Sequence, residues 1–310
     1  MPSPAADALP RGTWDTHVHV FEPTSHPYSS TRSYSPVEAP LTALLNFSNS
    51  ISSTDSPTNL VIVQPSPYGT DNSCLVDALD DLNSNTSNVN ARGIAVVDIS
   101  SATKDTLQEL HRRGVRGLRI NLESSANNDF TVERLESMIA ESAAAISFLP
   151  GWVLQLYIKG HYWDALLPFI MSLRVPIIAD HLGGIVGSSK NSGLTDPLAQ
   201  PGYTSLIHLA KAGHVYIKVS GLYRVSNKAP GFEDLQVIVH DLARQVPDQL
   251  LYASDWPHTG EAKDRISRPH DAPERFREID DRLVISNLRA WVGESTWQKM
   301  CIDNPVRLFL

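Results

Sequence analysis

The pattern that most constrains the fold of this chain is a repeated alternation of short apolar runs with longer segments of helical periodicity. The runs are rich in β-branched residues and have the length of strands. They lie at residues 13–21, 59–64, 92–98, 115–121, 152–159, 176–181, 215–220 and 250–255. The helical segments lie at residues 71–84, 103–113, 131–147, 162–173, 203–213, 233–246 and 273–293. Strand–helix alternation favours parallel pairing, and this number of repeats closes into an α/β fold, the (β/α)8 TIM barrel.

Length and composition agree with one barrel domain. The chain has 310 residues, of which 42% are hydrophobic and 19% are charged, as in ordinary globular proteins. We therefore expect a single domain over residues 1–310, with residues 1–10 as a flexible N-terminal tail. An open dinucleotide-binding sheet is the weaker alternative, because its Gly-rich phosphate fingerprint is missing. The Ser/Thr/Pro-rich run at 23–40 is expected to form a long loop beside the first strand.

Charge and hydropathy exclude several classes of partner. A formal net charge of −8 argues against nucleic acid, which needs a concentrated basic surface. No apolar run reaches the length of about 18 residues that suggests a membrane span. Residues 1–10 lack the charged start and apolar core of a secretory signal, so we expect a cytoplasmic protein. Cys74 and Cys301 lie far apart, without the spacing of a metal motif. The sequence leaves the oligomeric state open, and a homo-oligomer is one alternative.

The first apolar run contains the pair His17 and His19. Successive side chains of a strand alternate between faces, so these two imidazoles point the same way while Val18 points the other way. Two imidazoles side by side suit a divalent metal or the polarisation of a substrate carbonyl. Either use needs further groups from elsewhere in the chain.

The active site of a (β/α)8 barrel lies at the carboxyl ends of its strands. His181 and Asp255 fall at two of these ends, and with His17 and His19 they form the candidate catalytic set. A carboxylate such as Asp255 can orient a water molecule and take its proton as the water attacks a carbonyl carbon. The three imidazoles could stabilise the carbonyl oxygen directly, or they and Asp255 could hold a Zn²⁺ that does so.

Other polar residues near the strand ends are candidates for binding substrate. Arg119 and Arg224 come from different strands and are expected over one opening, where they could clamp a carboxylate. This favours a small anionic substrate, although salt bridges to acids at the rim are an alternative. Tyr157 could donate a hydrogen bond. Further candidates come from a strand end, from the long loop and from the rim, namely Gln64, Tyr34 and His258.

Several motifs in the same order resemble the amidohydrolase-related TIM-barrel hydrolases, and within them the 2-pyrone-4,6-dicarboxylate lactonases. The resemblance covers almost the whole chain. It rests on DTHVHVF (15–21), VIVQ (61–64) with GTDN (69–72), ARGIAVVD (91–98), RGLRIN (116–121), DHLG (180–183), SDWPH (254–258) and NPVRL (304–308).

The resemblance implies roles for the candidate residues. His17, His19 and His181 would contact the lactone carbonyl, Asp255 would activate water, and Tyr157, Arg119 and Arg224 would hold the substrate. The pyrone lactonases work without a metal, whereas related lactonases and decarboxylases bind one Zn²⁺. The fifth strand offers Tyr157 and no histidine, which removes one usual ligand and favours catalysis without a cofactor.

Two departures from the pyrone lactonase pattern bear on the substrate. Ser125 stands where a second basic residue is expected, and Gly260 stands near the place of an asparagine. The leading hypothesis is therefore hydrolysis of a related lactone or ester, with one carboxylate or a bulkier ring. The alternative is Zn²⁺-dependent non-oxidative decarboxylation of an aromatic or unsaturated acid. A third hypothesis, a binding protein without turnover, is disfavoured because the histidines and the aspartate are all retained.

Overall fold

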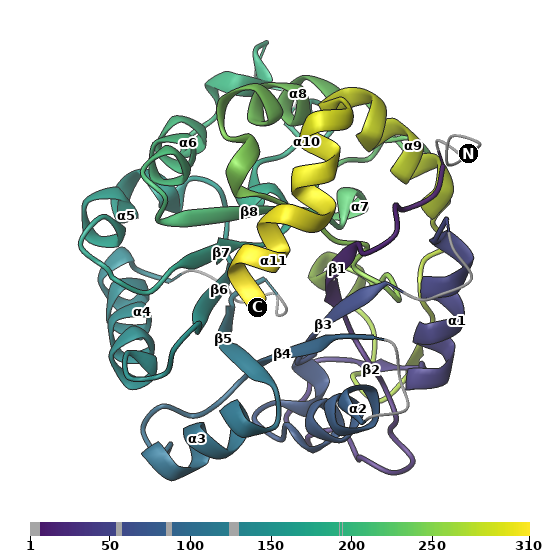
Figure 1. The fold of residues 1–310 in the computed structure, drawn as a ribbon, viewed down its shortest axis with the longest axis vertical. Coiled ribbons are helices and arrows are strands. Elements are labelled where there is room, and N and C mark those ends of the chain that lie inside the picture. Colours follow the sequence, from purple (N-terminus) through teal and green to yellow (C-terminus); the bar gives the residue numbers. More distant parts are fainter. Residues whose placement is uncertain (1–6, 54–57, 85–88, 124–129, 192, 194) are drawn as a thin grey trace.

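A parallel sheet curved into a barrel forms the centre of the computed structural model, with helices around it (Figure 1). The model describes residues 7–53, 58–84, 89–123, 130–191, 193 and 195–310. The eight strands follow one another around the sheet in chain order. They are β1 (Trp14–Val18), β3 (Asn59–Val63), β4 (Ala91–Ala95), β5 (Val115–Asn121), β6 (Val153–Tyr157), β7 (Ile177–Ala179), β8 (Val215–Val219) and β9 (Leu250–Tyr252). The predicted TIM barrel is confirmed.

The barrel closes where β1 meets the segment after β9. Val18 forms a parallel bridge with Trp256, and the backbone N–H of His19 donates to the Trp256 carbonyl (3.0 Å). The N–H of Asp255 donates to the His17 carbonyl (3.0 Å). Three residues of the candidate catalytic set therefore lie at this seam.

The expected helices are present, with one correction. Those found in the expected places are α2 (Ser73–Asn83), α3 (Lys104–Arg112), α4 (Val132–Ile146), α5 (Tyr162–Ile170), α6 (Tyr203–Lys211) and α8 (Gln236–Gln245). The helix expected at 273–293 begins later, as α9 (Asp281–Val292). Asp280 caps it, because its side chain accepts a hydrogen bond from the N–H of Leu283 (3.0 Å).

The structure also contains elements that the sequence did not predict. These are the helices α1 (Leu41–Ile51), α7 (Leu222–Val225), α10 (Glu294–Gln298) and α11 (Asn304–Phe309), and a parallel pair of short strands, β2 (Ser35–Pro36) and β10 (Pro273–Glu274). The expected 23–40 loop is thus tied to a distant segment. Of the expected tail 1–10, residues 1–6 lie outside the described part. Leu9 is buried and its N–H donates to the Ile51 carbonyl (2.8 Å), so this residue is not part of a free tail.

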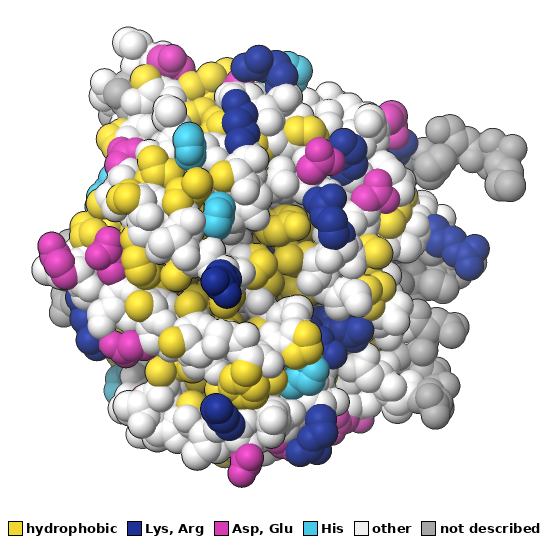
Figure 2. Space-filling model, turned by 60° about the vertical axis from the view of Figure 1, so that its left-hand side comes forward, with side chains coloured by type: hydrophobic (Ala, Val, Ile, Leu, Met, Phe, Trp, Pro, Cys, Tyr) yellow, Lys and Arg dark blue, Asp and Glu magenta, His cyan; other side chains and the backbone are white. Residues whose placement is uncertain are grey.

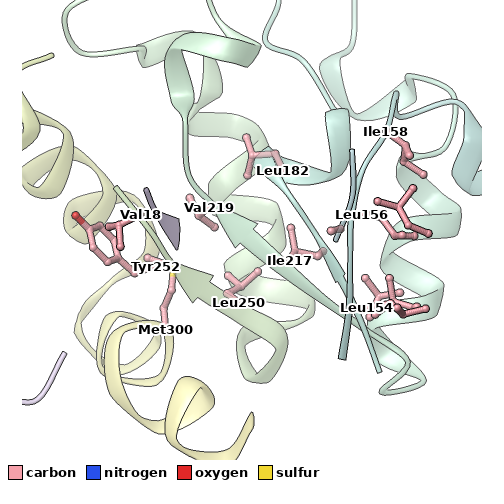
Figure 3. Close-up of a cluster of buried hydrophobic side chains, with 14 of the residues drawn as sticks. Val18, Leu154, Leu156, Ile158, Leu182, Ile217, Val219, Leu250, Tyr252 and Met300 are labelled. Carbon is pink, nitrogen blue, oxygen red and sulfur yellow. The ribbon is translucent and has the colours of Figure 1, made fainter. Parts of the chain in front are cut away.

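Hydrophobic side chains pack on both sides of the barrel wall. Outward-facing strand residues such as Leu154, Ile217 and Leu250 pack against the helices (Figure 3). Inside, an apolar layer fills the amino-terminal end of the barrel, where Trp14 stacks on Phe309 of α11 with ring centroids 6.2 Å apart. Above this layer the interior becomes polar.

The outer surface is mixed. On the face shown in Figure 2, hydrophobic side chains gather in a hollow and charged side chains are scattered around it. Among the described helices, none is both long enough and apolar enough to cross a bilayer.

Candidate active site

An irregularity in β1 aims both histidines into the barrel. Between Asp15 and Val18, β1 advances three residues while β3 advances two, so one residue of β1 is extra. In an unbroken strand, Trp14 and His17 would face opposite sides. The bulge changes the phase, so that Trp14 points into the apolar layer and His17 and His19 also point inward above it.

His181 and Asp255 lie just beyond the ends of β7 and β9, and not on the strands as expected. Both have left-handed backbone conformations, with φ of 51° and 64°. Such values are uncommon for residues with a side chain and are frequent at functional sites. Nδ1 of His181 lies 3.0 Å from the Ser220 hydroxyl, which fixes the ring. The turn after each strand therefore aims its side chain back over the barrel axis.

The Asp255 carboxylate is held on one side and open on the other. Its Oδ2 accepts hydrogen bonds from the Tyr223 hydroxyl (2.7 Å) and from Nε of Arg224 (2.6 Å). Its Oδ1 lies 3.8 Å from Nε2 of both His17 and His19. Oδ1 and Nε2 of His17 are buried and have no hydrogen-bond partner among the described residues. These two atoms are free to meet a ligand.

The histidines of the site are neutral. Burial lowers the pKa of His19 to about 3 and that of His181 to about 4, and it holds the pKa of His17 well below 6.5. Nδ1 of His19 lies 2.7 Å from the carbonyl oxygen of Val63, which can only accept. Nδ1 of His19 therefore carries the proton, and its Nε2 presents a lone pair to the site.

Below the histidines lies a layer of buried polar side chains. Nζ of Lys218 donates to Oε1 of Gln155 (2.7 Å), and Nε2 of Gln155 donates to Oδ2 of Asp180 (2.9 Å). The Asp180 carboxylate also lies 3.6 Å from Lys218, 3.6 Å from Arg119 and 3.3 Å from Nδ1 of His17. Opposite charges thus compensate each other in the interior.

The electrostatic setting keeps both aspartates ionised. Burial alone would raise the pKa of Asp255, but the adjacent Arg224 guanidinium holds it well below its usual value of 3.8. Burial would likewise raise the pKa of Asp180, but the Lys218 ammonium group beside it lowers it. Burial lowers the pKa of Lys218 to about 8, so the ammonium form predominates at neutral pH.

A cavity of about 270 Å³ opens above this cluster. Four of the residues expected to contact substrate line it, and so does His19 of the catalytic set. Acidic and basic side chains of the rim add to the lining. The lining residues include His19, Tyr34, Arg119, Tyr157, Arg224, Glu123, Glu261 and Arg265.

Gln64 and His258 were also expected to contact substrate, but neither lines this cavity. Nε2 of Gln64 donates to the carbonyl of Asp71 (2.6 Å), so the side chain holds the loop after β3. Nε2 of His258 lies 3.0 Å from Oδ2 of Asp281, which ties the loop after β9 to α9. Loop contacts therefore engage both side chains.

Several cavity residues already have partners within the protein. Arg224 bonds Asp255, and its Nη2 also donates to the Thr259 hydroxyl (2.9 Å). The guanidinium of Arg265 stacks 3.4 Å above the Tyr34 ring centroid and pairs with Glu274 (2.7 Å). Arg119 is less constrained, because its buried Nε has no hydrogen-bond partner among the described residues.

Sequence reasoning missed Tyr223 and the role of the buried polar layer. Gln155 and Lys218 occupy inward positions of β6 and β8, and Asp180 directly follows β7. The three lie two residues from Tyr157, Ser220 and Ile178, so period-two alternation could have marked them. Tyr223 belongs to a four-residue helix, α7, that periodicity does not reveal.

The donor atoms suit a divalent cation. Ligand atoms of His17, His181 and Asp255 lie within 4.8 Å of one another, and all three residues are buried. Imidazole nitrogen and carboxylate oxygen are ligands that Zn²⁺ takes in catalytic sites. Nε2 of His17 and Oδ1 of Asp255 have no hydrogen-bond partner among the described residues, so they are available to bind the cation when Nε2 carries a lone pair.

The fold and the site define a class of protein, a TIM barrel with a buried cluster of histidine and aspartate side chains at the carboxyl ends of its strands. This is the end at which TIM-barrel enzymes have their active sites. Within this class, the chain belongs to the amidohydrolase family, whose model matches residues 14–310.

Relatives and solved structures agree with this assignment. The chain is 30% identical to a 4-sulfomuconolactone hydrolase of Rhizobium radiobacter, covering 99% of this chain and 93% of the relative. It is 27% identical to a 2-pyrone-4,6-dicarboxylate hydrolase of Comamonas testosteroni, with the same coverage. A crystal structure of a "probable 2-pyrone-4,6-dicarboxylic acid hydrolase" of Acinetobacter baumannii matches with a TM-score of 0.71 at 24% identity, over 96% of this chain and 99% of that one. This last match supports the fold.

Proposed function

We propose that this protein is a lactonase, a hydrolase that opens a cyclic ester by attack of a water molecule activated by Asp255. The observation that carries the proposal is the pair of buried, unpartnered atoms, Oδ1 of Asp255 and Nε2 of His17, which lie 3.8 Å apart. Oδ1 of Asp255 can take a proton, and Nε2 of His17 can contact a carbonyl oxygen. The relatives named above are lactone hydrolases, which favours ring opening over the decarboxylation considered from the sequence.

The attacking water has two acceptors within reach. Oδ1 of Asp255 and Nε2 of His19 lie 3.8 Å apart, and both can accept its hydrogen bonds. As the water oxygen bonds to the carbonyl carbon, one of its protons moves to Asp255. The negative charge that develops on the carbonyl oxygen needs a donor, and Nε2 of His17 is placed to supply it. The ring ester bond then breaks, and the released ring oxygen takes the proton from Asp255.

If the site holds Zn²⁺, the candidate ligands are His17, His181 and Asp255. The ion would supply Lewis acidity at the carbonyl oxygen. Arg224 and Tyr223 would still orient the Asp255 carboxylate, because both bind its Oδ2.

The cavity favours an anionic substrate with one carboxylate. Arg119 and Arg224 line it, and Arg224 is shared with Asp255. A substrate carboxylate that draws Arg224 away would leave Asp255 less neutralised and more basic. Glu123 lines the same cavity and would repel a second carboxylate. Ser125, the other departure from the pyrone lactonase pattern, lies outside the described residues.

The test compares two lactones, a butenolide with one carboxymethyl group and 2-pyrone-4,6-dicarboxylate. We expect ring opening, followed by the loss of ring absorbance, with a higher kcat/KM for the singly charged compound. Asp255→Asn should reduce kcat by about 1,000-fold, since general-base catalysis alone contributes about 100-fold or more. Asp248→Asn, on the exposed surface, serves as the matched control. Undiminished turnover in Asp255→Asn, or no turnover of either lactone, would contradict the proposal.

Metal content decides between the two forms of this mechanism. Purified protein is analysed by inductively coupled plasma mass spectrometry, and turnover is measured before and after chelation. We expect activity that chelation leaves unchanged. Loss of activity together with about one Zn²⁺ per chain would assign the ligand role to the cluster.

A further inference from the structure

Lys218 is a fully buried cation that touches the site from below, and the mechanism above gives it no role. We propose that Lys218 is a positioning residue that fixes His17 in the tautomer protonated at Nε2, and thereby makes His17 the hydrogen-bond donor of the site. The inference rests on the proposed lactonase function, since it names the group that receives the carbonyl oxygen.

The contacts of Lys218 leave its ammonium group aimed at His17. Nζ donates to Oε1 of Gln155 (2.7 Å) and lies 3.4 Å from Nδ1 of His17, in hydrogen-bonding geometry. An ammonium group has three donors and no acceptor. Nδ1 of His17 must therefore be the acceptor in this contact, and the proton of the neutral ring is then on Nε2.

Asp180 is the competitor for the same nitrogen. Its Oδ1 lies 3.3 Å from Nδ1 of His17, close enough to accept a hydrogen bond if that nitrogen carries the proton. However, this Oδ1 makes no hydrogen bond with any residue that the structure describes, whereas Oδ2 accepts from Gln155. Gln155 thus binds both Lys218 and Asp180 and holds the carboxylate in a position where its Oδ1 is not engaged.

The tautomer decides what His17 can do. With the proton on Nε2, His17 donates to a carbonyl oxygen but cannot bind a metal ion through this atom. With the proton on Nδ1, the ring donates a hydrogen bond to Asp180, and Nε2 presents a lone pair that can bind Zn²⁺, as in carboxylate–histidine–zinc arrangements. His19, whose Nδ1 donates to Val63, is already in the lone-pair form at Nε2. The two neighbouring histidines would then have complementary roles, one as donor and one as acceptor.

The direct test is the nitrogen NMR spectrum of the imidazoles in the full-length protein, labelled with ¹⁵N at histidine. Protonated and unprotonated ring nitrogens have well-separated shifts, and the His17 signals are assigned by their loss in His17→Gln. We expect Nε2 of His17 protonated and Nδ1 unprotonated. The opposite pattern in the wild-type protein would overturn the inference, and this measurement needs no variant of Lys218 to fold.

Two variants test whether Lys218 is the cause. Lys218→Met removes the donor at similar volume, and we expect His17 to change tautomer. Its affinity for Zn²⁺ alone, measured by competition with a chromogenic chelator, should rise about tenfold or more, which is the size by which outer-shell changes alter metal affinity. Its kcat for the lactone should fall about 100-fold with little change in KM, as for loss of one oxyanion donor. Asp180→Asn retains Lys218 and should retain the Nε2 tautomer.

The outcomes separate the two proposals. A protein that opens no lactone but shows His17 protonated at Nε2 refutes the function and leaves the tautomer assignment standing. A protein that opens lactones while Lys218→Met keeps the wild-type tautomer and Zn²⁺ affinity refutes the role of Lys218 alone.

Discussion

At the scale of single residues, the hydroxyl of Tyr223 is one of two donors that fix Oδ2 of Asp255. We predict that Tyr223→Phe lowers kcat about tenfold, because the carboxylate loses a hydrogen bond to a charged acceptor worth about 1.5–3 kcal/mol and can rotate away from the site. Steady-state kinetics with the accepted lactone measure the effect. Tyr216→Phe, on β8 near the opposite end of the barrel, is the control. Equal kinetics for the two variants would mean that Arg224 alone positions Asp255.

The buried neutral imidazole of His19 predicts a pH dependence of stability. Its pKa falls from 6.5 to about 3 on folding, so below pH 6.5 the unfolded chain binds a proton that the folded protein does not bind. The free energy of unfolding should therefore fall as pH falls from about 6 to 4, by about 1.4 kcal/mol per pH unit from this group. Urea unfolding at several pH values tests this, with His19→Gln expected to have the shallower dependence.

The buried carboxyl group of Asp15 makes stability change with pH in the opposite direction, which is why the wild type is compared with His19→Gln. Burial raises its pKa from 3.8 to about 7, so the folded protein binds the extra proton, and this contribution to stability is lost as pH rises toward 7. Asp15 is present in both proteins. An identical pH dependence in the wild type and in His19→Gln would contradict a neutral His19.

Side-chain direction explains which candidate residues could be predicted. His17 and His19 could be assigned to one face because strand geometry fixes their alternation. Arg119 and Tyr157 line the cavity for the same reason, as they lie on strands. Gln64 and His258 lie in loops beyond strand ends, where the local turn decides the side-chain direction. Gln64 is engaged by a backbone carbonyl of its own loop, and His258 by Asp281 of α9.

At the scale of elements, the start of α7 is packed closely against the site. A Cβ on Gly221 (φ 53°) would come within 2.7 Å of Oδ2 of Asp255 and of Nδ1 of His181. We predict that Gly221→Ala lowers both stability, by about 1–3 kcal/mol, and kcat, because the two catalytic side chains must move. Thermal unfolding and steady-state kinetics give the two values.

Gly213 provides the matched control for this substitution. It also has a left-handed backbone (φ 81°), but a Cβ there would meet nothing within 4 Å. Gly213→Ala should therefore show the backbone strain of about 1 kcal/mol without the loss of kcat. Equal losses of activity in both variants would argue against crowding as the cause.

Element types were easier to predict than element ends. The strands and most helices followed from hydrophobic periodicity, whereas α9 begins eight residues later than the pattern suggested, at Asp281 rather than residue 273. The local sequence before it pairs with Ser35–Pro36, and this pairing of distant segments leaves no periodic signal in a two-residue strand.

At the scale of the whole molecule, the two ends of the barrel interior differ in chemistry. The amino-terminal end is closed by Trp14 and Phe309, and the cavity lies at the other end. We predict that Phe309→Ala lowers the free energy of unfolding by about 3 kcal/mol while kcat at low temperature stays within about twofold, because the lost packing is remote from the site. Urea unfolding and kinetics test this, with the half-exposed Val306→Ala as control. A large loss of kcat in the folded variant would show coupling between the ends.

The bulge in β1 has a consequence for how such a barrel could be adapted. It lets Trp14 pack inside one end of the barrel while His17 and His19 point into the site at the other end. In a regular strand, the odd spacing between residues 14 and 17 would place them on opposite faces. Residues above the extra position can therefore be substituted to fit a substrate ring of different shape or charge, while the packed layer beneath is left unchanged. A library confined to the cavity lining, with residues 14 and 309 kept, is the part of this scaffold in which substrate preference can be changed at the lowest risk to folding.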